Sequence, residues 1–146
     1  MTSKGTGSRK FRILIVEDEV DLLEIIGDVL KEQPDFEVRT ETNGYDAVLT
    51  IASWRPDIVL LDFVMPKMNG FELCKLLRQS PETRDVLILA ITGLTNPENR
   101  RAVYESGITD FMGKPFRGDD LTAKVRTLLE IAANRQDPAS DFSLQE

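Results

Sequence analysis

The chain has 146 residues, a formal net charge of −7 and 41% hydrophobic residues, which is the size and composition of one ordinary globular domain. The acidic balance argues against a surface for duplex nucleic acid, which needs clustered Lys and Arg. Histidine is absent and the single cysteine is Cys74, so Ser/His/Asp and Cys/His catalysis, histidine-ligated metals and an internal disulfide are excluded.

The apolar runs are too short to span a bilayer, and the polar, basic N-terminus leads into only six strand-like residues. That pattern does not fit a secretory signal, so we expect a cytoplasmic chain that does not insert into membranes. The chemistry of such a chain must depend on carboxylates, lysines, hydroxyls and the backbone.

Strand-like and helix-like patterns alternate five times along the chain. The strands are predicted at residues 11–16, 36–42, 57–62, 85–92 and 109–114, and the helices at about residues 22–30, 44–54, 71–80, 96–106 and 119–134. The half-polar second strand fits the edge of a sheet, whereas the apolar third and fourth strands are typical of central parallel strands covered on both faces. This alternation predicts a parallel sheet with helices on both faces and right-handed crossovers.

Apolar residues at helical spacing predict which face of each helix is buried. Those expected on the buried faces are Leu22, Ile25, Ile26, Val29, Leu30, Val48, Ile51, Ala52, Phe71, Leu73, Cys74, Leu76, Leu77, Leu121, Val125, Leu128, Leu129 and Ala132. Residues 10–133 are therefore predicted to form the domain. A flexible polar segment, 1–9, precedes it, and residues 134–146 form a polar tail or the start of a linker.

Polar side chains stand at the carboxyl ends of four predicted strands. Glu17 and Asp18 follow the first strand, Asp62 ends the third, Thr92 ends the fourth and Lys114 ends the fifth. Because open α/β sheets bind ligands beyond the carboxyl ends of their strands, we expect these side chains to converge at one edge.

Three carboxylates at one edge would repel each other, at a cost of about 4 kcal/mol per pair at about 4 Å and an effective dielectric near 20. A hard divalent cation relieves that repulsion, and Mg²⁺ suits a few carboxylate oxygens together with water and phosphate. Lys114 offers a positive charge to a phosphoryl oxygen, the Thr92 hydroxyl can donate to another, and Gly93 leaves room for the group. The combination favours phosphoryl transfer with Asp62 as the carboxylate nucleophile.

The segments "LIVEDE", "VLLDFVMPKMNGFEL", "ILAITG" and "FMGKPF" resemble the receiver domain of two-component response regulators, the CheY-like family. The resemblance covers roughly residues 10–133. The spacing agrees as well: 44 residues separate Asp18 from Asp62, 30 separate Asp62 from Thr92, and 22 separate Thr92 from Lys114. It implies an α/β fold, a single doubly wound (βα)5 flavodoxin-like domain whose five-stranded parallel sheet has the strand order 2-1-3-4-5.

The resemblance also implies roles for the acids. Asp62 would accept a phosphoryl group from a phosphohistidine on a sensor histidine kinase or a histidine phosphotransfer protein. Mg²⁺ would be held by Asp18, Asp62 and the backbone carbonyl of Val64, with Glu17 acting through water.

The same resemblance implies that Thr92 and Lys114 hold phosphoryl oxygens and that the Lys114–Pro115 peptide bond is cis, which aims the lysine at the site. Phe111 falls on the aromatic switch position. On phosphorylation Thr92 would be drawn to the phosphoryl group and Phe111 would turn inward, which repacks the face made by the fourth helix, fifth strand and fifth helix. The chain would then be a regulatory domain, not an enzyme with an external substrate.

Val64 and Leu94 depart from the pattern of family members that lose their phosphate quickly. Those members carry polar side chains two residues after the phosphoacceptor and two after the threonine, where they orient the attacking water. Neither Val64 nor Leu94 can hydrogen-bond a water through its side chain. We therefore expect slow self-dephosphorylation.

Structural roles compete for some of these residues. Asp18 is also suited to cap the helix that follows it, Phe111 is also suited to an ordinary core position, and Cys74 on an apolar face fits a buried thiol.

Other functions are less well supported. A haloacid-dehalogenase-like phosphatase needs a second Asp two residues after its nucleophile, where this chain has Val64. A dinucleotide-binding domain needs a glycine-rich loop after a strand, and "VEDEVD" follows the first strand instead. A phosphorylation-independent interaction module on the same fold remains an alternative. Within the main interpretation, phosphorylation-dependent dimerisation through the switch face is a further possible outcome. The downstream protein target is not identified by the sequence.

Overall fold

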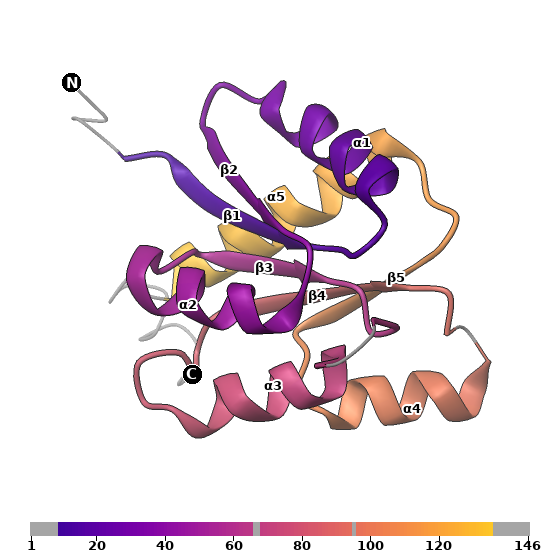
Figure 1. The fold of residues 1–146 in the computed structure, drawn as a ribbon. Helices are drawn as coiled ribbons and strands as arrows, with labels where there is room; N and C mark the ends of the chain where they lie inside the picture. The colour runs from indigo at the N-terminus through magenta and orange to yellow at the C-terminus, as the bar shows by residue number, and fades with distance from the viewer. Residues whose placement is uncertain (1–8, 66–67, 95, 136–146) are drawn as a thin grey trace, which may run out of the picture.

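Five parallel strands form one sheet in the order β2–β1–β3–β4–β5, as expected (Figure 1). The strands are β1 (Phe11–Val16), β2 (Phe36–Glu41), β3 (Ile58–Leu61), β4 (Leu87–Thr92) and β5 (Asp110–Gly113). The helices that connect and follow them are α1 (Val20–Lys31), α2 (Gly44–Trp54), α3 (Gly70–Gln79), α4 (Pro97–Glu105) and α5 (Gly118–Arg135). The fold is the predicted doubly wound α/β domain.

The computed structural model describes residues 9–65, 68–94 and 96–135. The predicted N-terminal segment 1–9 and the tail 134–146 lie almost entirely outside these residues, so both stay predictions. Within the described ranges, no helix has the length and the apolar composition needed to cross a membrane.

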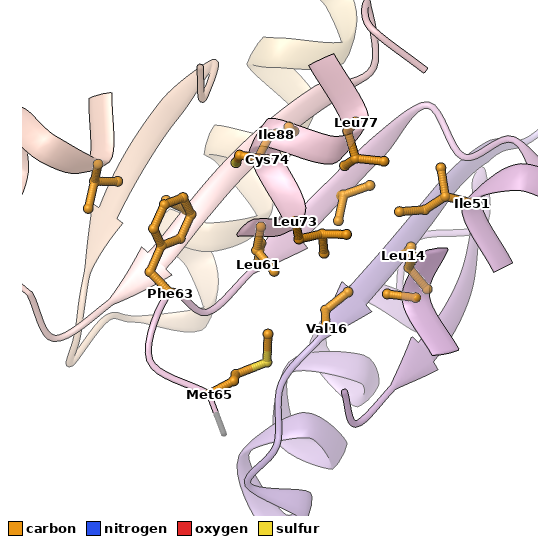
Figure 2. Packing of buried hydrophobic residues seen from close by; sticks show 14 of the residues in the cluster. Leu14, Val16, Ile51, Leu61, Phe63, Met65, Leu73, Cys74, Leu77 and Ile88 are labelled. Atoms are coloured by element: carbon orange, nitrogen blue, oxygen red, sulfur yellow. The ribbon is translucent and has the colours of Figure 1, made fainter. Parts of the chain in front are cut away.

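The helices cover the sheet on both faces (Figure 1). α1 and α5 pack on one face, where alternate β1 residues Ile13 and Ile15 join a buried cluster with Leu121 and Val125. α2, α3 and α4 pack on the other face. The side chains gathered there come from β1, β3, β4 and these three helices, and most of them are seen in Figure 2.

Central strand β3 is buried throughout its length. It pairs with β1 through Val16 opposite Leu61, and with β4 through Leu61 opposite Ala90. Both of its faces are covered by helices, so alternation of polar and apolar residues is absent, as is usual in a parallel sheet. Edge strand β2 has the half-polar pattern that predicted its position.

Three residues predicted on buried helix faces are instead exposed: Ile25, Ala52 and Leu76. The sheet-facing stripe of α2 consists of Ala47, Ile51 and Trp54. Ala52 lies one residue beyond Ile51, about 100° around the helix, and therefore faces solvent. The same rotation places Leu76 beside, not within, the buried stripe of α3.

Helix α1 carries two apolar rows, whereas helical spacing alone predicts a single buried face. Leu23, Ile26 and Leu30 enter the core. Leu22 and Val29 are half-buried and Ile25 is 57% exposed, so this second row faces the surface.

Candidate functional site

The strand ends bring the predicted acids to one edge of the sheet. The β1–β3 ladder continues past the strands, because the Asp62 backbone N–H donates to the Val16 carbonyl at 3.1 Å. On the other side of β1, the Glu17 N–H donates to the Glu41 carbonyl at 3.1 Å. These backbone bonds hold Asp62 and Glu17 beside each other at the end of β1 and β3.

Carboxylate oxygens of Glu17, Asp18 and Asp62 lie within 4.8 Å of one another. Glu17 and Asp62 are buried, with 2% and 6% of their surface exposed, and Asp18 is exposed. These are hard oxygen donors at a spacing that one Mg²⁺ can bridge while it retains water. The residues present therefore fit the magnesium ion that the resemblance implies.

Lys114 reaches this cluster from the end of β5. Its Nζ donates to Glu17 Oε1 at 3.0 Å and to Asp62 Oδ2 at 3.1 Å. The second Asp62 oxygen, Oδ1, accepts from the Val64 backbone N–H at 3.1 Å. The Lys114–Pro115 peptide bond is cis. Both oxygens of Asp62 are thus engaged by donors.

Burial and charge act against each other on the ionisable groups of the site. Burial raises the pKa of Glu17, and hydrogen bonds from Lys114 and the Glu19 backbone only partly oppose that rise. Burial by itself lowers the pKa of Lys114, but the hydrogen bonds to Glu17 and Asp62 outweigh it, and the pKa lies above its ordinary value. Lys114 is therefore a fixed positive charge at neutral pH.

Asp18 is not the N-cap of α1. Glu19 occupies the N-cap position and its side chain makes no capping hydrogen bond. Asp18 thus has no capping role that competes with its place in the acidic cluster.

Thr92 lies at the end of the neighbouring strand β4 and is fully buried. Its hydroxyl accepts from the Leu94 backbone N–H at 3.2 Å. Leu94 packs partly against the cluster that α2, α3 and α4 cover, whereas Val64 is 57% exposed beside Asp62. Among the described residues, no hydrogen bond joins the Thr92 hydroxyl to the acids.

Phe111 lies apart from the acids, on the side of the sheet covered by α4. Its ring stacks on the ring of Tyr104, with centroids 6.1 Å apart and an interplanar angle of 29°. The Arg100 guanidinium lies 5.5 Å from the centre of the same ring. Arg100 and Tyr104 are not among the predicted site residues, although their spacing of one helical turn indicates that both face one way.

An apolar hollow borders Lys114. It is lined by the second row of α1, Leu22, Ile25 and Val29, and by Pro115, Phe116 and Gly118 after β5. Helical periodicity also predicts burial of this row, because periodicity alone cannot tell a buried row from an exposed row beside it.

The fold and the site together define a class: a doubly wound α/β domain with an acidic cluster and a lysine at the carboxyl ends of its strands. Comparison with known proteins identifies that class further. The family model for the response regulator receiver domain matches residues 13–126. The chain therefore belongs to the response regulator receiver domains of two-component systems.

Curated relatives include a regulator from Synechocystis described as the DNA-binding dual master transcriptional regulator RpaA, which is 30% identical over 118 residues. The DNA-binding response regulator MtrA of Mycobacterium tuberculosis is 34% identical over 135 residues. The matches cover 81% and 92% of this chain, but only 48% and 57% of those relatives. The chain thus spans about half the length of the curated relatives that it matches.

Solved structures share the fold. The signal receiver domain of a signal transduction histidine kinase from Syntrophus aciditrophicus is 32% identical, with a TM-score of 0.76, and the match covers 82% of this chain and 90% of that one. The chemotaxis response regulator CheY4 of Vibrio cholerae is 27% identical, with a TM-score of 0.75, over 81% of this chain and 98% of that one.

Proposed function

We propose that this chain is a phosphorylation-controlled switch in which Asp62 accepts a phosphoryl group from a phosphohistidine of a sensor histidine kinase or a histidine phosphotransfer protein. The observation that carries the proposal is the ammonium of Lys114 between Glu17 and Asp62, 3.0 and 3.1 Å away, in a cluster with Asp18. A lysine and three acids in this arrangement match the charge distribution that phosphoryl transfer requires.

In the proposed reaction an oxygen of the Asp62 carboxylate attacks phosphorus. The P–N bond of the phosphohistidine breaks, its electron pair returns to the imidazole nitrogen, and that nitrogen takes up a proton. The product is an aspartyl phosphate. Lys114 holds one phosphoryl oxygen and the Thr92 hydroxyl donates to another, so charge that develops on the phosphoryl group meets donors already in place.

Mg²⁺ would be held by Asp18, Asp62 and the Val64 carbonyl, with Glu17 acting through water. When bound, the ion supplies positive charge to the phosphoryl oxygens and offsets the repulsion among the acids. The role of this chain's own residues is to keep the three carboxylates together, which the backbone bonds from Glu17 to Glu41 and from Asp62 to Val16 support.

The phosphoryl donor would reach Asp62 across the surface beside Lys114. Asp62 is 6% exposed, so the donor's imidazole must enter a narrow opening while the rest of the donor rests on the rim. The apolar hollow beside Lys114, lined by the second row of α1 and by Pro115, offers the donor an apolar contact there. Exposed Asp21, Glu24 and Asp28 on the same helix favour a donor with basic residues around an apolar stripe.

Phosphorylation would then draw Thr92 towards the phosphoryl group, allow Phe111 to turn inward, and change the face formed by α4, β5 and α5. That face is where we expect the downstream protein, or a second copy of the chain, to bind. RpaA and MtrA are DNA-binding proteins, each about twice as long as the part that this chain matches. For the chain itself, whose net charge is −7, we propose a protein partner.

The test is to incubate the protein with acetyl phosphate and Mg²⁺ and to measure its intact mass. We expect one added phosphoryl group on the wild type and none on Asp62→Asn. Asp85→Asn is a matched control, because Asp85 is an exposed carboxylate that precedes β4 at the opposite edge of the sheet, and this variant should be labelled like the wild type.

The alternative is an interaction module that works without phosphorylation. An unlabelled wild type would favour this alternative. Labelling that persists in Asp62→Asn would place the acceptor elsewhere and overturn the assignment.

A further inference from the structure

Phe111 is held from one side by two residues of α4. Arg100 and Tyr104 are one helical turn apart, so both side chains leave α4 towards β5. The Tyr104 ring stacks on the Phe111 ring, with centroids 6.1 Å apart, and the Arg100 guanidinium lies 5.5 Å from the centre of the Phe111 ring. The position of Phe111 is therefore coupled to that of α4.

Tyr104 has an anchor of its own. Its hydroxyl donates to Asp110 Oδ1 at 3.4 Å, and Asp110 Oδ2 accepts from Lys124 Nζ of α5 at 3.0 Å. This chain of contacts ties the Tyr104 ring to β5 and α5 whether or not Phe111 stacks on it. The Tyr104 ring is thus a stable surface on which the Phe111 ring stacks.

Arg100 differs in this respect. Within residues 9–65, 68–94 and 96–135, no carboxylate forms an ion pair with Arg100, and its contact is with the Phe111 ring. A guanidinium over an aromatic face is attractive, and here the attraction is not shared with a salt bridge. Arg100 therefore acts on the position of the Phe111 ring without a competing salt bridge.

The path from Phe111 to Thr92 is open on this face of β5. Thr92 is opposite Gly113 in the β4–β5 register, and Ala90 is opposite Phe111. Residues two apart on a strand share a face, so Phe111 and Gly113 lie on the same side of the sheet as Thr92. Gly113 has no side chain, so β5 places nothing between the Phe111 ring and Thr92.

We propose that Arg100 is a positioning residue that holds the Phe111 ring against Tyr104, in the observed position, in the unphosphorylated protein and thereby sets how readily Asp62 is phosphorylated. This proposal rests on the proposed function, since it assumes that Phe111 moves inward when Asp62 carries phosphate. A ligand or modification that favours the inward position must work against the contact between Arg100 and the ring. Removal of the contact shifts the equilibrium inward by about two- to fivefold.

The test compares Arg100→Ala with Arg101→Ala. Both variants remove one positive charge from exposed positions of α4, but Arg101 makes no cation–π contact with the Phe111 ring. Arg100→Lys retains the charge but makes a weaker cation–π contact with the Phe111 ring. Urea unfolding of each variant verifies that the fold is intact.

The first measurement needs no phosphorylation. Nuclear Overhauser effects between the rings of Phe111 and Tyr104 report their stacking, and with two tyrosines in the chain the Tyr104 ring is assigned by comparison with Tyr45→Phe. We expect these effects to weaken in Arg100→Ala and to stay at wild-type intensity in Arg101→Ala. Unchanged intensity in Arg100→Ala would overturn the proposal.

The second measurement is the rate of labelling by acetyl phosphate with Mg²⁺. We expect a rise of about two- to fivefold in Arg100→Ala, a smaller rise in Arg100→Lys, and none in Arg101→Ala. If Arg100 acted only by attracting the anionic donor, the loss of its charge would slow labelling equally in both alanine variants. That result would overturn the proposal. If the wild type is not labelled at all, the proposed function fails, and the ring measurement alone decides whether Arg100 holds Phe111.

Discussion

Lys114 bridges two buried carboxylates: its Nζ is 3.0 Å from Glu17 Oε1 and 3.1 Å from Asp62 Oδ2. The ammonium therefore occupies the same cluster of negative charge that a magnesium ion would enter. It stabilises the acids in the absence of metal, and it repels a second cation that binds to them.

Replacement of Lys114 should consequently have opposite effects on metal binding and on phosphorylation. In Lys114→Met the site loses one positive charge, so we expect Mg²⁺ to bind at least about fivefold more tightly, which corresponds to about 1 kcal/mol of relieved repulsion. Labelling by acetyl phosphate should fall by about 100-fold, because a donor to the phosphoryl group is lost. Calorimetric titration and intact mass measure the two effects.

Lys75→Met is the control for this comparison, since Lys75 is an exposed residue of α3 outside the acidic cluster. It should change neither quantity. Weaker Mg²⁺ binding in Lys114→Met would contradict the prediction and would mean that Lys114 serves mainly to hold the acids together.

The lifetime of the aspartyl phosphate should be long and should depend on Val64. This side chain is 57% exposed beside Asp62 and offers no hydrogen bond to an attacking water. We expect the isolated phosphorylated protein to lose phosphate over hours, and Val64→Asn to lose it about tenfold faster, since one well-placed hydrogen bond is worth about 1.4 kcal/mol of barrier. The decay of the phosphorylated mass with time measures both.

Val20→Asn controls for the added amide, because Val20 is also exposed and begins α1. It should leave the decay unchanged. A wild-type lifetime of seconds would refute the prediction. Leu94 is the less suitable position for this test, because it packs partly against the core and its replacement would also affect stability.

The sequence was sufficient to predict every strand and helix, because each element has its own hydrophobic period and the parallel sheet leaves β3 and β4 almost wholly apolar. It also predicted that Glu17, Asp18, Asp62 and Lys114 would meet, since each follows a strand. The structure brings these four together. The roles of Thr92 and Phe111 in the proposed switch stay predictions.

The sequence was not sufficient where two rows of one helix are both apolar. In α1 the rows Leu23–Ile26–Leu30 and Leu22–Ile25–Val29 have the same helical period, and only the position of the loop after β5 decides which row is left beside the hollow. Contacts between separate elements, such as that of Arg100 with Phe111, depend on the packing of α4 against β5 and leave no periodic signal.

Gly70 should be intolerant of a side chain. A Cβ at this position would lie 2.5 Å from Phe63 Cδ1 and 2.7 Å from the Phe63 Cα, so the Phe63 backbone as well as its ring would have to move. The ring is also packed edge to face against Phe71, with centroids 4.9 Å apart. We expect Gly70→Ala to lower the free energy of unfolding by about 1–3 kcal/mol in urea titrations.

Gly93→Ala is the matched control, since among the described residues other than Gly93 and its two chain neighbours no heavy atom lies within 4 Å of a Cβ built there. Its free energy of unfolding should stay within about 0.5 kcal/mol of the wild type. Equal stability of Gly70→Ala and Gly93→Ala would show that α3 can shift away from Phe63 at little cost.

Cys74 should be inert in the folded protein and should make stability depend on alkaline pH. The side chain is fully buried, and burial raises the pKa of its thiol to about 11 from 9.0, against the smaller effects of Ser106 and Arg78. Because the folded pKa lies above the unfolded one, the contribution to stability is complete below pH 9 and is lost as the pH rises from 9 to 11. The loss amounts to about 2–3 kcal/mol.

Urea unfolding of the wild type and of Cys74→Ala across this pH range measures that contribution, because lysines and tyrosines titrate alike in both proteins. The stability of the wild type should fall more steeply than that of Cys74→Ala. A thiol reagent should modify the wild type only as fast as the protein unfolds, so its rate should rise with urea. Parallel stability curves for the two proteins, or rapid modification without urea, would mean that α3 opens locally and exposes the thiol.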